Sequence, residues 1–526
     1  MTAARPPSIA RASAIIAAGN IASRVLGLGR EIVLSNLFGA SRALEAFNNA
    51  VLVTRSLFDL LIAGHINSAI VPVLSEIDAK HGRDSLWRVL AALAGMVVLA
   101  LAVIVIGMIA AALPIARIIG GDTATIEETA GLIRLTAPAL LLMCVFALYS
   151  GALYALRIFT YPALAAAVFN GTMVAVTLAL GGSRQIEAAA VAWIAAAAAQ
   201  LALQLYGLRT GKLRLSLRWH DPLVAPVLRR IGGLYLPVIG SLIVDLITTR
   251  FFTYALAARA LIDHGNNYMQ WATTLIQFPQ GLVATAISAA VLPTLSRAAV
   301  AERDGDTPEG QSFSDMLGIG LRMTTVLILP AALALAVLAV PIIQVVFEHG
   351  AFTPYDTGVT ALALRLYVIG LPFAAWDLLL VYAFYARQDT LTPALVGVVS
   401  LIVYAVAAVL LFPVFDLYAL MLADAVKHVT HTVISALILA RRGSVFANQR
   451  LIGTFARALA ASLGMAGVGL LVMQAAAPLF GTNTLNEIAG VGLSLAACGA
   501  AYFVLGVILR LEELSMLRRV VRRLWP

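Results

Sequence analysis

The stretch LAALAGMVVLALAVIVIGMIAAAL, residues 90–113, contains no charged side chain. A helix that crosses a bilayer needs about 20 predominantly apolar residues, and this stretch is long enough. Similar runs recur along nearly the whole chain. Of the 526 residues, 61% are hydrophobic and only 12% are charged, too few polar side chains to cover a soluble globule of this size. The sequence therefore predicts an all-α membrane protein.

Apolar runs between charged and Gly- or Pro-rich breaks predict about fourteen membrane helices. They start near Ile9, Ala46, Leu90, Gly131, Tyr161, Ile186, Pro226, Tyr268, Met316, Asp356, Pro393, Leu417, Thr454 and Asn486. Lys and Arg gather in alternate connections and in the basic tail Arg518–Arg523. Since basic connections stay on the cytoplasmic side, both termini are expected in the cytoplasm of a multi-pass protein of the inner or plasma membrane.

Three pairs of similar segments indicate an internal repeat. AIVPVLSE (69–76) resembles AVLPTLSR (290–297), LPIARIIGG (113–121) resembles VPIIQVVFEHG (340–350), and YALRIFTYPAL (154–164) resembles YARQDTLTPAL (385–395). The order is the same and each offset is about 220 to 230 residues, as in transporters built from repeats. We predict two six-helix lobes in a parallel pseudo-twofold repeat, residues 1–215 and 222–445, and a C-terminal helix pair, residues 446–526.

Several functional classes lack their sequence signals. The net charge of +9 follows the connections between spans, so no nucleic-acid partner is expected. No phosphate-binding loop, zinc-protease motif or nucleophile elbow is present, which predicts a transporter and not an enzyme. Cys144 and Cys498 both lie in apolar runs, and His428 and His431 have no third ligand nearby in sequence, so no metal site is expected.

Charged residues inside the apolar runs are candidate functional residues, because a charge in the bilayer is costly unless it is paired or hydrated. Arg24, Arg30, Arg55 and Arg250 place guanidinium groups in membrane helices of both lobes. Guanidinium groups stay charged and bind phosphate oxygens in bidentate fashion. These residues predict a cavity for an anionic substrate such as a diphosphate. The alternative is that they only pair with carboxylates, as Arg55 can with Asp59 one turn away.

Acidic side chains in the spans are candidates for coupling to an ion. Asp245 and Asp377 are the two proposed positions for Na⁺ or H⁺, with the membrane potential as the other energy source. Asp424 forms a polar stripe with Lys427, His428 and His431, and for Asp424 an ion pair with Lys427 is favoured over an ion site.

Several motifs resemble the lipid II flippase (MurJ/MviN) family of the multidrug/oligosaccharidyl-lipid/polysaccharide exporter superfamily. They are SRVLGLGREIVLSNLFGA (23–40), EAF (45–47), AIVPVLSE (69–76), QFPQGL (277–282), VLPTLS (291–296), HGAFTPYDT (349–357) and FYARQDTLTP (384–393). The resemblance implies alternating access around a cationic cavity, a groove at the last two helices for the lipid tail, and a role in peptidoglycan biosynthesis. It identifies Arg24 and Arg30 with cavity arginines, and Glu45 with a position that is usually Asp.

The sequence also departs from the family's pattern. Phe58 and Asp59 stand where the family has an Arg pair, and Thr273, Thr274 and Gln277 replace an Asp-Arg pair and a Glu. Leu378 stands where a Lys is expected. We expect Arg55 and Arg250 to compensate, because a side chain displaced by one turn, about 5.4 Å, reaches the same cavity.

The leading interpretation is a flippase that moves lipid II from the inner to the outer leaflet. The expected partners are that lipid and the bilayer, and the expected state is a monomer. The alternatives are a flippase for another polyprenyl-diphosphate glycan, a cation-coupled drug exporter, and a transport-inactive scaffold of envelope synthesis. A cavity rich in arginine disfavours an exporter of cationic drugs.

Overall fold

The computed structural model describes residues 9–63, 70–209, 211, 215–217, 221–222, 224–227, 229–230, 246–281, 285–304, 312–443, 445–446, 449–476 and 484–514. Within these ranges the ordered elements are helices and none is a strand. The chain divides into two compact units, Met1–Arg259 and Ala260–Pro526.

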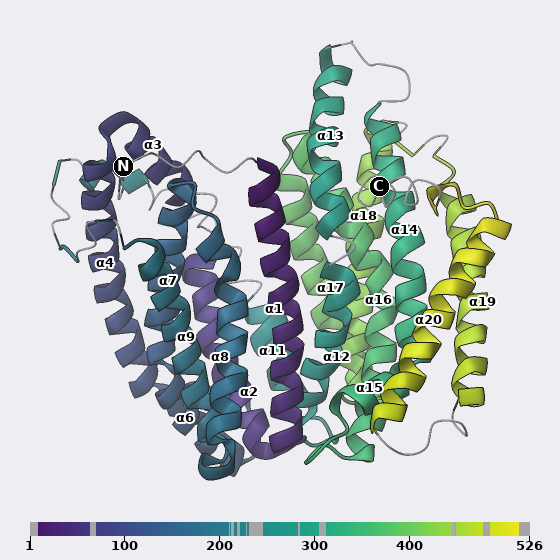
Figure 1. Cartoon of the computed structure of the whole chain (residues 1–526), viewed down its shortest axis with the longest axis horizontal. Coiled ribbons are helices and arrows are strands. Elements are labelled where there is room, and N and C mark those ends of the chain that lie inside the picture. Colours follow the sequence, from purple (N-terminus) through teal and green to yellow (C-terminus); the bar gives the residue numbers. More distant parts are fainter. Residues whose placement is uncertain are drawn as a thin grey trace. The chain divides into compact units, whose positions relative to one another are not determined.

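The first unit is a bundle of helices, drawn from purple to teal in Figure 1. Its helices are α1 (Ile9–Phe38), α2 (Arg42–Phe58), α3 (Val71–His81), α4 (Arg83–Ala110), α5 (Ala112–Ile119), α6 (Thr123–Thr136), α7 (Pro138–Ala155), α8 (Thr160–Arg184), α9 (Glu187–Gly207) and α11 (Phe252–Ala257). Two short π-helical segments, η1 (Asp59–Ala63) and η3 (Leu246–Phe251), follow α2 and precede α11. The main packing partners are α1 with α8, α8 with α9, α7 with α9, and α2 with α6.

The second unit contains the remaining helices, drawn from teal to yellow in Figure 1. They are α12 (Gly265–Pro279), α13 (Thr285–Asp304), α14 (Phe313–Val337), α15 (Ala339–Phe347), α16 (Pro354–Ala386), α17 (Leu391–Phe415), α18 (Tyr418–Arg441), α19 (Leu451–Ala476) and α20 (Thr484–Ile508). Here α18 packs on α16 and α17, while α19 lies between α14 and α20.

Ten of the described helices are long and apolar enough to cross a membrane: α4, α7, α8, α9, α14, α16, α17, α18, α19 and α20. Each corresponds to one of the fourteen predicted spans, so the all-α membrane fold is confirmed. Of the other four predicted spans, three correspond to α1, which carries Arg24 and Arg30, α2, which carries Arg55, and α12, which has 15 residues. The span predicted near Pro226 lies largely outside the described residues.

Helix α17 shows how a membrane helix divides its surface between protein and lipid. Its buried residues include Val396, Ser400, Tyr404 and Ala408, which lie at four-residue spacing along one side. Large apolar side chains elsewhere on the helix, such as Ile402 and Val414, are exposed. Since α18 is the main neighbour of α17, the buried side contacts protein and the exposed apolar side suits lipid.

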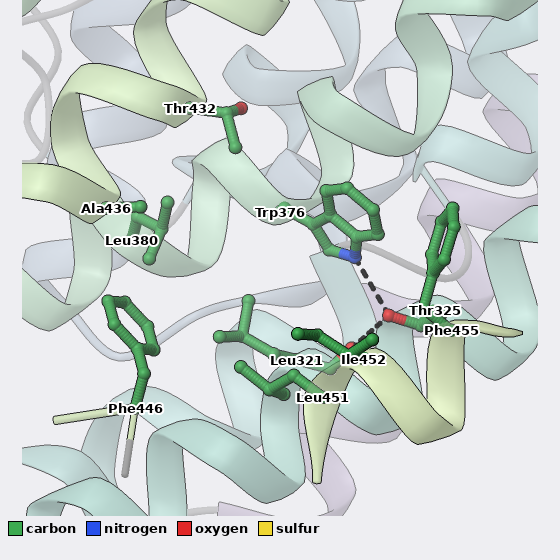
Figure 2. Close-up of a pocket in the computed structure, with 10 residues that line it drawn as sticks. All are labelled: Leu321, Thr325, Trp376, Leu380, Thr432, Ala436, Phe446, Leu451, Ile452 and Phe455. Carbon is green, nitrogen blue, oxygen red and sulfur yellow. Dashed lines mark hydrogen bonds between the residues drawn. The ribbon is translucent and has the colours of Figure 1, made fainter. Parts of the chain in front are cut away.

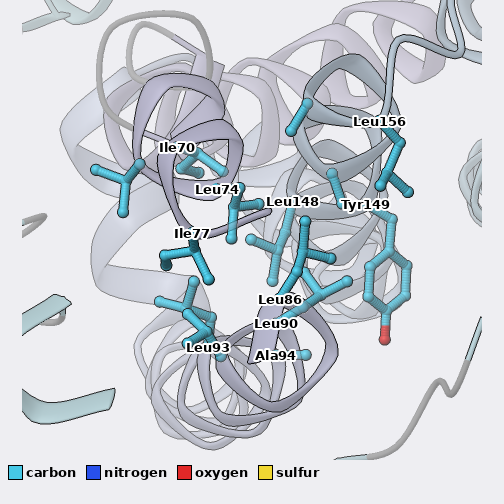
Figure 3. Close-up of a cluster of buried hydrophobic side chains, with 14 of the residues drawn as sticks. Ile70, Leu74, Ile77, Leu86, Leu90, Leu93, Ala94, Leu148, Tyr149 and Leu156 are labelled. Carbon is cyan, nitrogen blue, oxygen red and sulfur yellow. The ribbon is translucent and has the colours of Figure 1, made fainter. Parts of the chain in front are cut away.

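Leucine-rich faces of α3, α4 and α7 pack into one core in the first unit (Figure 3). Leu74 of α3, Leu86 and Leu90 of α4, and Leu148 of α7 are almost fully buried in it. At about 2 kcal/mol or more for each fully buried Leu side chain, this core fixes the three helices relative to one another.

The predicted internal repeat is visible as matched helix ends. Arg157 after α7 and Gln388 after α16 both have φ of 60°, at equivalent positions of the two YA-containing motifs. Gln185 ends α8 with φ 46° and ψ −136°, and Asp416 ends α17 with φ 50° and ψ −133°. Left-handed backbone at non-glycine residues is uncommon, so its recurrence at matched places supports two copies of one helix pattern.

The proposed lobe limits, residues 1–215, 222–445 and 446–526, follow the sequence repeat. The compact units instead divide after Arg259 and include the C-terminal helices in the second unit. One division follows similarity between segments of the sequence and the other follows the compactness of the structure, so the three-part organisation stays a prediction.

Candidate substrate site

Two of the predicted arginines lie on α1, in the first unit. Arg24 and Arg30 are both half-buried, and six residues of helix separate them by about 9 Å along the axis. Helix α1 packs along α8, so a polar residue of α8 is well placed to hold them.

Arg30 is held by two side chains. Its Nη2 donates to Oε1 of Glu31 at 2.5 Å and its Nη1 donates to Oδ1 of Asn170 on α8 at 3.2 Å. The amide nitrogen of Asn170 donates to the carbonyl of Ser23 at 3.1 Å. Asn170 thus joins α8 to α1 and fixes the guanidinium, a role that sequence reasoning did not assign. The only sequence signal for it is a lone amide within an apolar run.

Arg55 lies on α2, between the buried residues Thr54 and Ser56, yet its own side chain is exposed. It interacts electrostatically with Arg30, Asp59 and Arg250. The sequence predicts that α2 lies within the membrane, and an exposed guanidinium there needs water or an anion beside it, because lipid tails satisfy none of its donors.

Asp59 and Arg250 form an ion pair of 2.7 Å, and each side chain is about one-third exposed. Both residues belong to π-helical segments, Asp59 to η1 and Arg250 to η3. Such segments are rare and are frequent at functional sites. Asp59 therefore has Arg250, a residue from a distant part of the chain, as its ion-pair partner, and it also interacts electrostatically with Arg55, the alternative partner that the sequence suggests.

Three arginines and two carboxylates thus interact within the first unit. Arg30, Arg55 and Arg250 carry three positive charges, against the two negative charges of Glu31 and Asp59. The phenol of Tyr254 on α11 is within electrostatic range of the same set. The carboxylates hold Arg30 and Arg250 in place, and one positive charge remains in excess. We call these five charged residues the arginine cluster.

Glu45 is buried in the first turn of α2. Ser41 caps this helix by accepting a hydrogen bond from the backbone N–H of Leu44 at 3.3 Å. A carboxylate at this position is stabilised by the positive end of the helix dipole, so Glu45 has a structural role at the beginning of α2. Its assignment to substrate binding stays a prediction.

The predicted ion-coupling residues have different outcomes. Asp245 lies outside the described residues. Asp377 of α16, in the second unit, contacts Nδ1 of His431 on α18. The predicted ion pair of Asp424 with Lys427 is confirmed at 2.5 Å. No group of three or more His, Cys, Asp or Glu suited to a metal ion is found in the part of the chain that the structure describes.

The second unit also contains an apolar pocket of about 320 Å³ (Figure 2). Its lining residues come from α14, α16, α18, α19 and the segment before α19: Leu321, Thr325, Trp376, Leu380, Thr432, Ala436, Phe446, Leu451, Ile452 and Phe455. The indole nitrogen of Trp376 donates to the hydroxyl of Thr325 at 3.0 Å, which orients the ring at the pocket wall. A pocket with so little polar lining suits a hydrocarbon chain.

Comparison with known proteins matches the chain, over residues 34–490, to the family model described as "Lipid II flippase MurJ". The chain belongs to the lipid II flippase MurJ family. The "Lipid II flippase MurJ" of Burkholderia cenocepacia is 28% identical over 467 residues, which cover 87% of this chain and 89% of that protein. The "Probable lipid II flippase MurJ" of Vibrio cholerae is 30% identical, and the match covers 74% of each chain.

Solved structures agree on the fold. A lipid II flippase MurJ in an inward closed conformation matches with a TM-score of 0.77 and 20% identity, covering 94% of this chain and 98% of that one. An inward-facing multidrug resistance MATE family transporter of the MOP superfamily matches with a TM-score of 0.68 and 15% identity, covering 81% and 95%. The chain therefore has the fold shared by MurJ and MATE transporters.

Apart from Asp59, which pairs with Arg250, the positions where the sequence departs from the MurJ pattern carry uncharged side chains. Phe58 is the last residue of α2. The hydroxyl of Thr274 donates to the backbone carbonyl of Gln270 at 2.9 Å on its own helix, α12, while the side chain of Gln277 is exposed. The four arginines that the sequence analysis proposes for substrate binding, Arg24, Arg30, Arg55 and Arg250, all lie in the first unit, on α1, α2 and η3.

Proposed function

We propose that this chain moves lipid II, a polyprenyl-diphosphate-linked peptidoglycan precursor, from the inner to the outer leaflet of the bacterial inner membrane by alternating access. The observation that carries the proposal is membership of the lipid II flippase MurJ family over residues 34–490. The chain then acts as a transporter, because flipping changes the position of the lipid without making or breaking a bond in it.

The arginine cluster supplies the chemistry that the lipid headgroup needs. A diphosphate loses its hydration when it leaves water, and that loss is the largest cost of crossing an apolar barrier. Arg55, which is exposed, and Arg250, which is about one-third exposed, offer guanidinium donors to phosphate oxygens. Arg30 adds positive charge that Asn170 holds in place. The excess positive charge of the cluster favours an anionic headgroup, and the planar guanidinium matches phosphate geometry. Arg24, on the same helix as Arg30, belongs to this proposed site.

The apolar pocket of the second unit suits part of the polyprenyl tail. Its wall includes Leu451, Ile452 and Phe455 from the start of α19, the first helix of the C-terminal pair. The apolar tail of the lipid then binds to an apolar pocket, and its diphosphate binds to guanidinium groups.

The proposal includes the orientation of the chain. The concentration of Lys and Arg in alternate connections supports a cytoplasmic location for both termini. The proposed working unit is a monomer, and lipid II and the bilayer are its partners.

The test is a leaflet-accessibility assay on the purified protein in vesicles. Lipid II labelled on its glycan is placed in one leaflet, and an impermeant reagent reports its arrival in the other. The proposal predicts that lipid II reaches both leaflets many times faster than in protein-free vesicles. A parallel sample with a different polyprenyl-diphosphate oligosaccharide addresses the alternative flippase.

The outcomes separate the candidates. Movement of the other glycan lipid without movement of lipid II would replace the proposed substrate. Binding of lipid II without movement of either lipid would contradict a flippase and favour the scaffold of envelope synthesis.

A further inference from the structure

A pocket of about 920 Å³ lies in the first unit, beside the beginning of α4. The polar side chains on its wall include Asp84 and Arg88 of α4 and Asp221 of the connection after α9, and the apolar ones include Ala92 and Leu217. The pocket shares no residue with the arginine cluster, and the proposed function does not use it.

The connection after α9 crosses α4 at this pocket. The backbone N–H of Ser216 donates to the carbonyl of Ala91 at 3.0 Å. A Cβ at Gly95 would lie 2.2 Å from the carbonyl oxygen of Ser216, so this close crossing requires a glycine. We call residues 215–217 the strap. Its two leucines are 62% and 54% exposed, and both line the pocket.

One face of α4 joins the pocket to an apolar stripe. Helix α4 packs mainly on α3 and α7, while Leu99, Val103 and Ile106 are 47%, 65% and 66% exposed. Positions 84, 88, 92, 95, 99, 103 and 106 are spaced by three or four residues, so they lie on the same face of the helix. Asp84 and Arg88 at the pocket are therefore in line with side chains that suit contact with lipid.

The order along this face matches the layers of a membrane. Arg88 is the last charged residue of α4, a candidate membrane span, and every residue from Val89 to Ala110 is uncharged. Asp84 and Ala91, where the strap crosses, are about 10 Å apart along the axis. A polar segment of this length followed by an apolar one is expected where lipid headgroups meet hydrocarbon. With both termini in the cytoplasm, as proposed above, this end of α4 lies in the inner leaflet.

We propose that the pocket binds a phospholipid of the inner leaflet whose headgroup has both an amine and a phosphate, as in phosphatidylethanolamine. The guanidinium of Arg88 binds the phosphate, and the carboxylates of Asp84 and Asp221 accept hydrogen bonds from the ammonium group. An acyl chain lies along the stripe from Leu99 to Ile106. This site goes beyond lipid II transport, because its ligand is a lipid of the surrounding bilayer.

Charge complementarity selects this lipid among those of a bilayer. Two carboxylates and one guanidinium offer partners for both signs of charge. The headgroup of phosphatidylglycerol has no cation for the carboxylates, and the trimethylammonium of phosphatidylcholine has no N–H to donate. Phosphatidylglycerol is the competing ligand, because the same connection contains three basic residues outside the described ranges, Lys212, Arg214 and Arg218.

The experiment titrates the purified full-length protein with phosphatidylethanolamine, phosphatidylcholine and phosphatidylglycerol that have the same acyl chains. Native mass spectrometry gives the dissociation constant of the first lipid bound. The wild type should bind phosphatidylethanolamine at least about tenfold more tightly than either other lipid. Arg88→Gln should weaken this binding by roughly tenfold or more, and the double variant Asp84→Asn with Asp221→Asn should remove the preference for the amine.

Arg83→Gln and Asp78→Asn are the matched controls. These two residues pair with each other at 3.3 Å beside the beginning of α4, and neither lines the pocket. Both variants should bind the lipid as the wild type does. The position is tested separately in vesicles, where phosphatidylethanolamine with a photoreactive group on one acyl chain should label α4 within residues 99–106.

Equal affinity of the wild type for the three lipids, or equal losses in Arg88→Gln and Arg83→Gln, would overturn the site. Tighter binding of phosphatidylglycerol that depends on Arg88 would contradict the proposed ligand and identify an anionic one. Labelling confined to other helices would contradict the proposed position. Because binding and labelling are measured without lipid II, a failure of the flippase proposal does not change these results.

Discussion

Replacing Arg55 with Gln tests whether the arginine cluster binds the diphosphate. Arg55 is exposed on α2, and its interactions with Arg30 and Arg250 are repulsive while its interaction with Asp59 is attractive. Because Asp59 keeps its ion pair with Arg250, removing the charge of Arg55 should not destabilise the fold. A hydrogen bond to a charged group is worth roughly 1.5–3 kcal/mol, so losing one to phosphate should weaken lipid II binding by about 10- to 150-fold.

The assay measures initial rates of lipid II movement in vesicles against the mole fraction of lipid II. A lost phosphate contact in the bound state raises KM for Arg55→Gln. The matched control is Arg42→Gln, which removes the same charge from the same helix. Arg42 pairs with Glu128 at 3.2 Å and is 54% exposed, and a surface pair of this kind is worth at most about 1 kcal/mol to stability.

Wild-type kinetics in Arg55→Gln, with an unchanged unfolding temperature, would show that Arg55 does not bind the diphosphate. Equal losses in Arg55→Gln and Arg42→Gln would lead to the same conclusion, because they would show a response to net charge and not to the cluster.

Two other predictions concern the anchoring of Arg30 and a loop carboxylate. Asn170→Ala removes the amide that joins Arg30 to α8. Loss of a hydrogen bond worth about 1–2 kcal/mol should lower kcat/KM for lipid II movement by roughly fivefold to thirtyfold. An unchanged kcat/KM would show that lipid II movement does not depend on the hydrogen bond between Asn170 and Arg30. Hydrogen bonds from the hydroxyl of Thr392 and the guanidinium of Arg442 lower the pKa of Asp389 to about 2. Since the pKa of an unfolded Asp is about 3.9, the stabilisation is complete above about pH 4 and is lost as the pH falls through 2. Asp389→Asn should therefore lower Tm at pH 7 and have no effect at the acid end of a pH series, whereas a Tm difference that is constant with pH would contradict the assignment.

The membrane fold was predictable because its signals are local. Apolar length, basic connections and repeated motifs such as the one around Arg157 are properties of short segments, and ten of the predicted spans appear as suitable helices among the described residues. The predicted spans that correspond to α1, α2 and α12 are not among these ten, because charged residues or a short length make these helices less clearly apolar.

The contacts within the site were less predictable, because they join segments far apart in sequence. Asn170 binds Arg30 across 140 residues, and Arg250 binds Asp59 across 191. Spacing along one helix allows Asp59 to pair with Arg55, but in the structure the ion pair of Asp59 is with Arg250 of η3. The residue types marked the charged side chains of the predicted spans as candidate functional residues. Which of them pair is determined by how the helices pack.

If guanidinium groups of the first unit bind a diphosphate, the protein should distinguish two lipids that differ by one phosphate. The dissociation constant of the purified protein is determined for a polyprenyl-diphosphate disaccharide and for the same lipid with a single phosphate. We expect the wild type to prefer the diphosphate by about tenfold or more and this preference to shrink in Arg55→Gln. Equal affinity for both lipids in the wild type would contradict it.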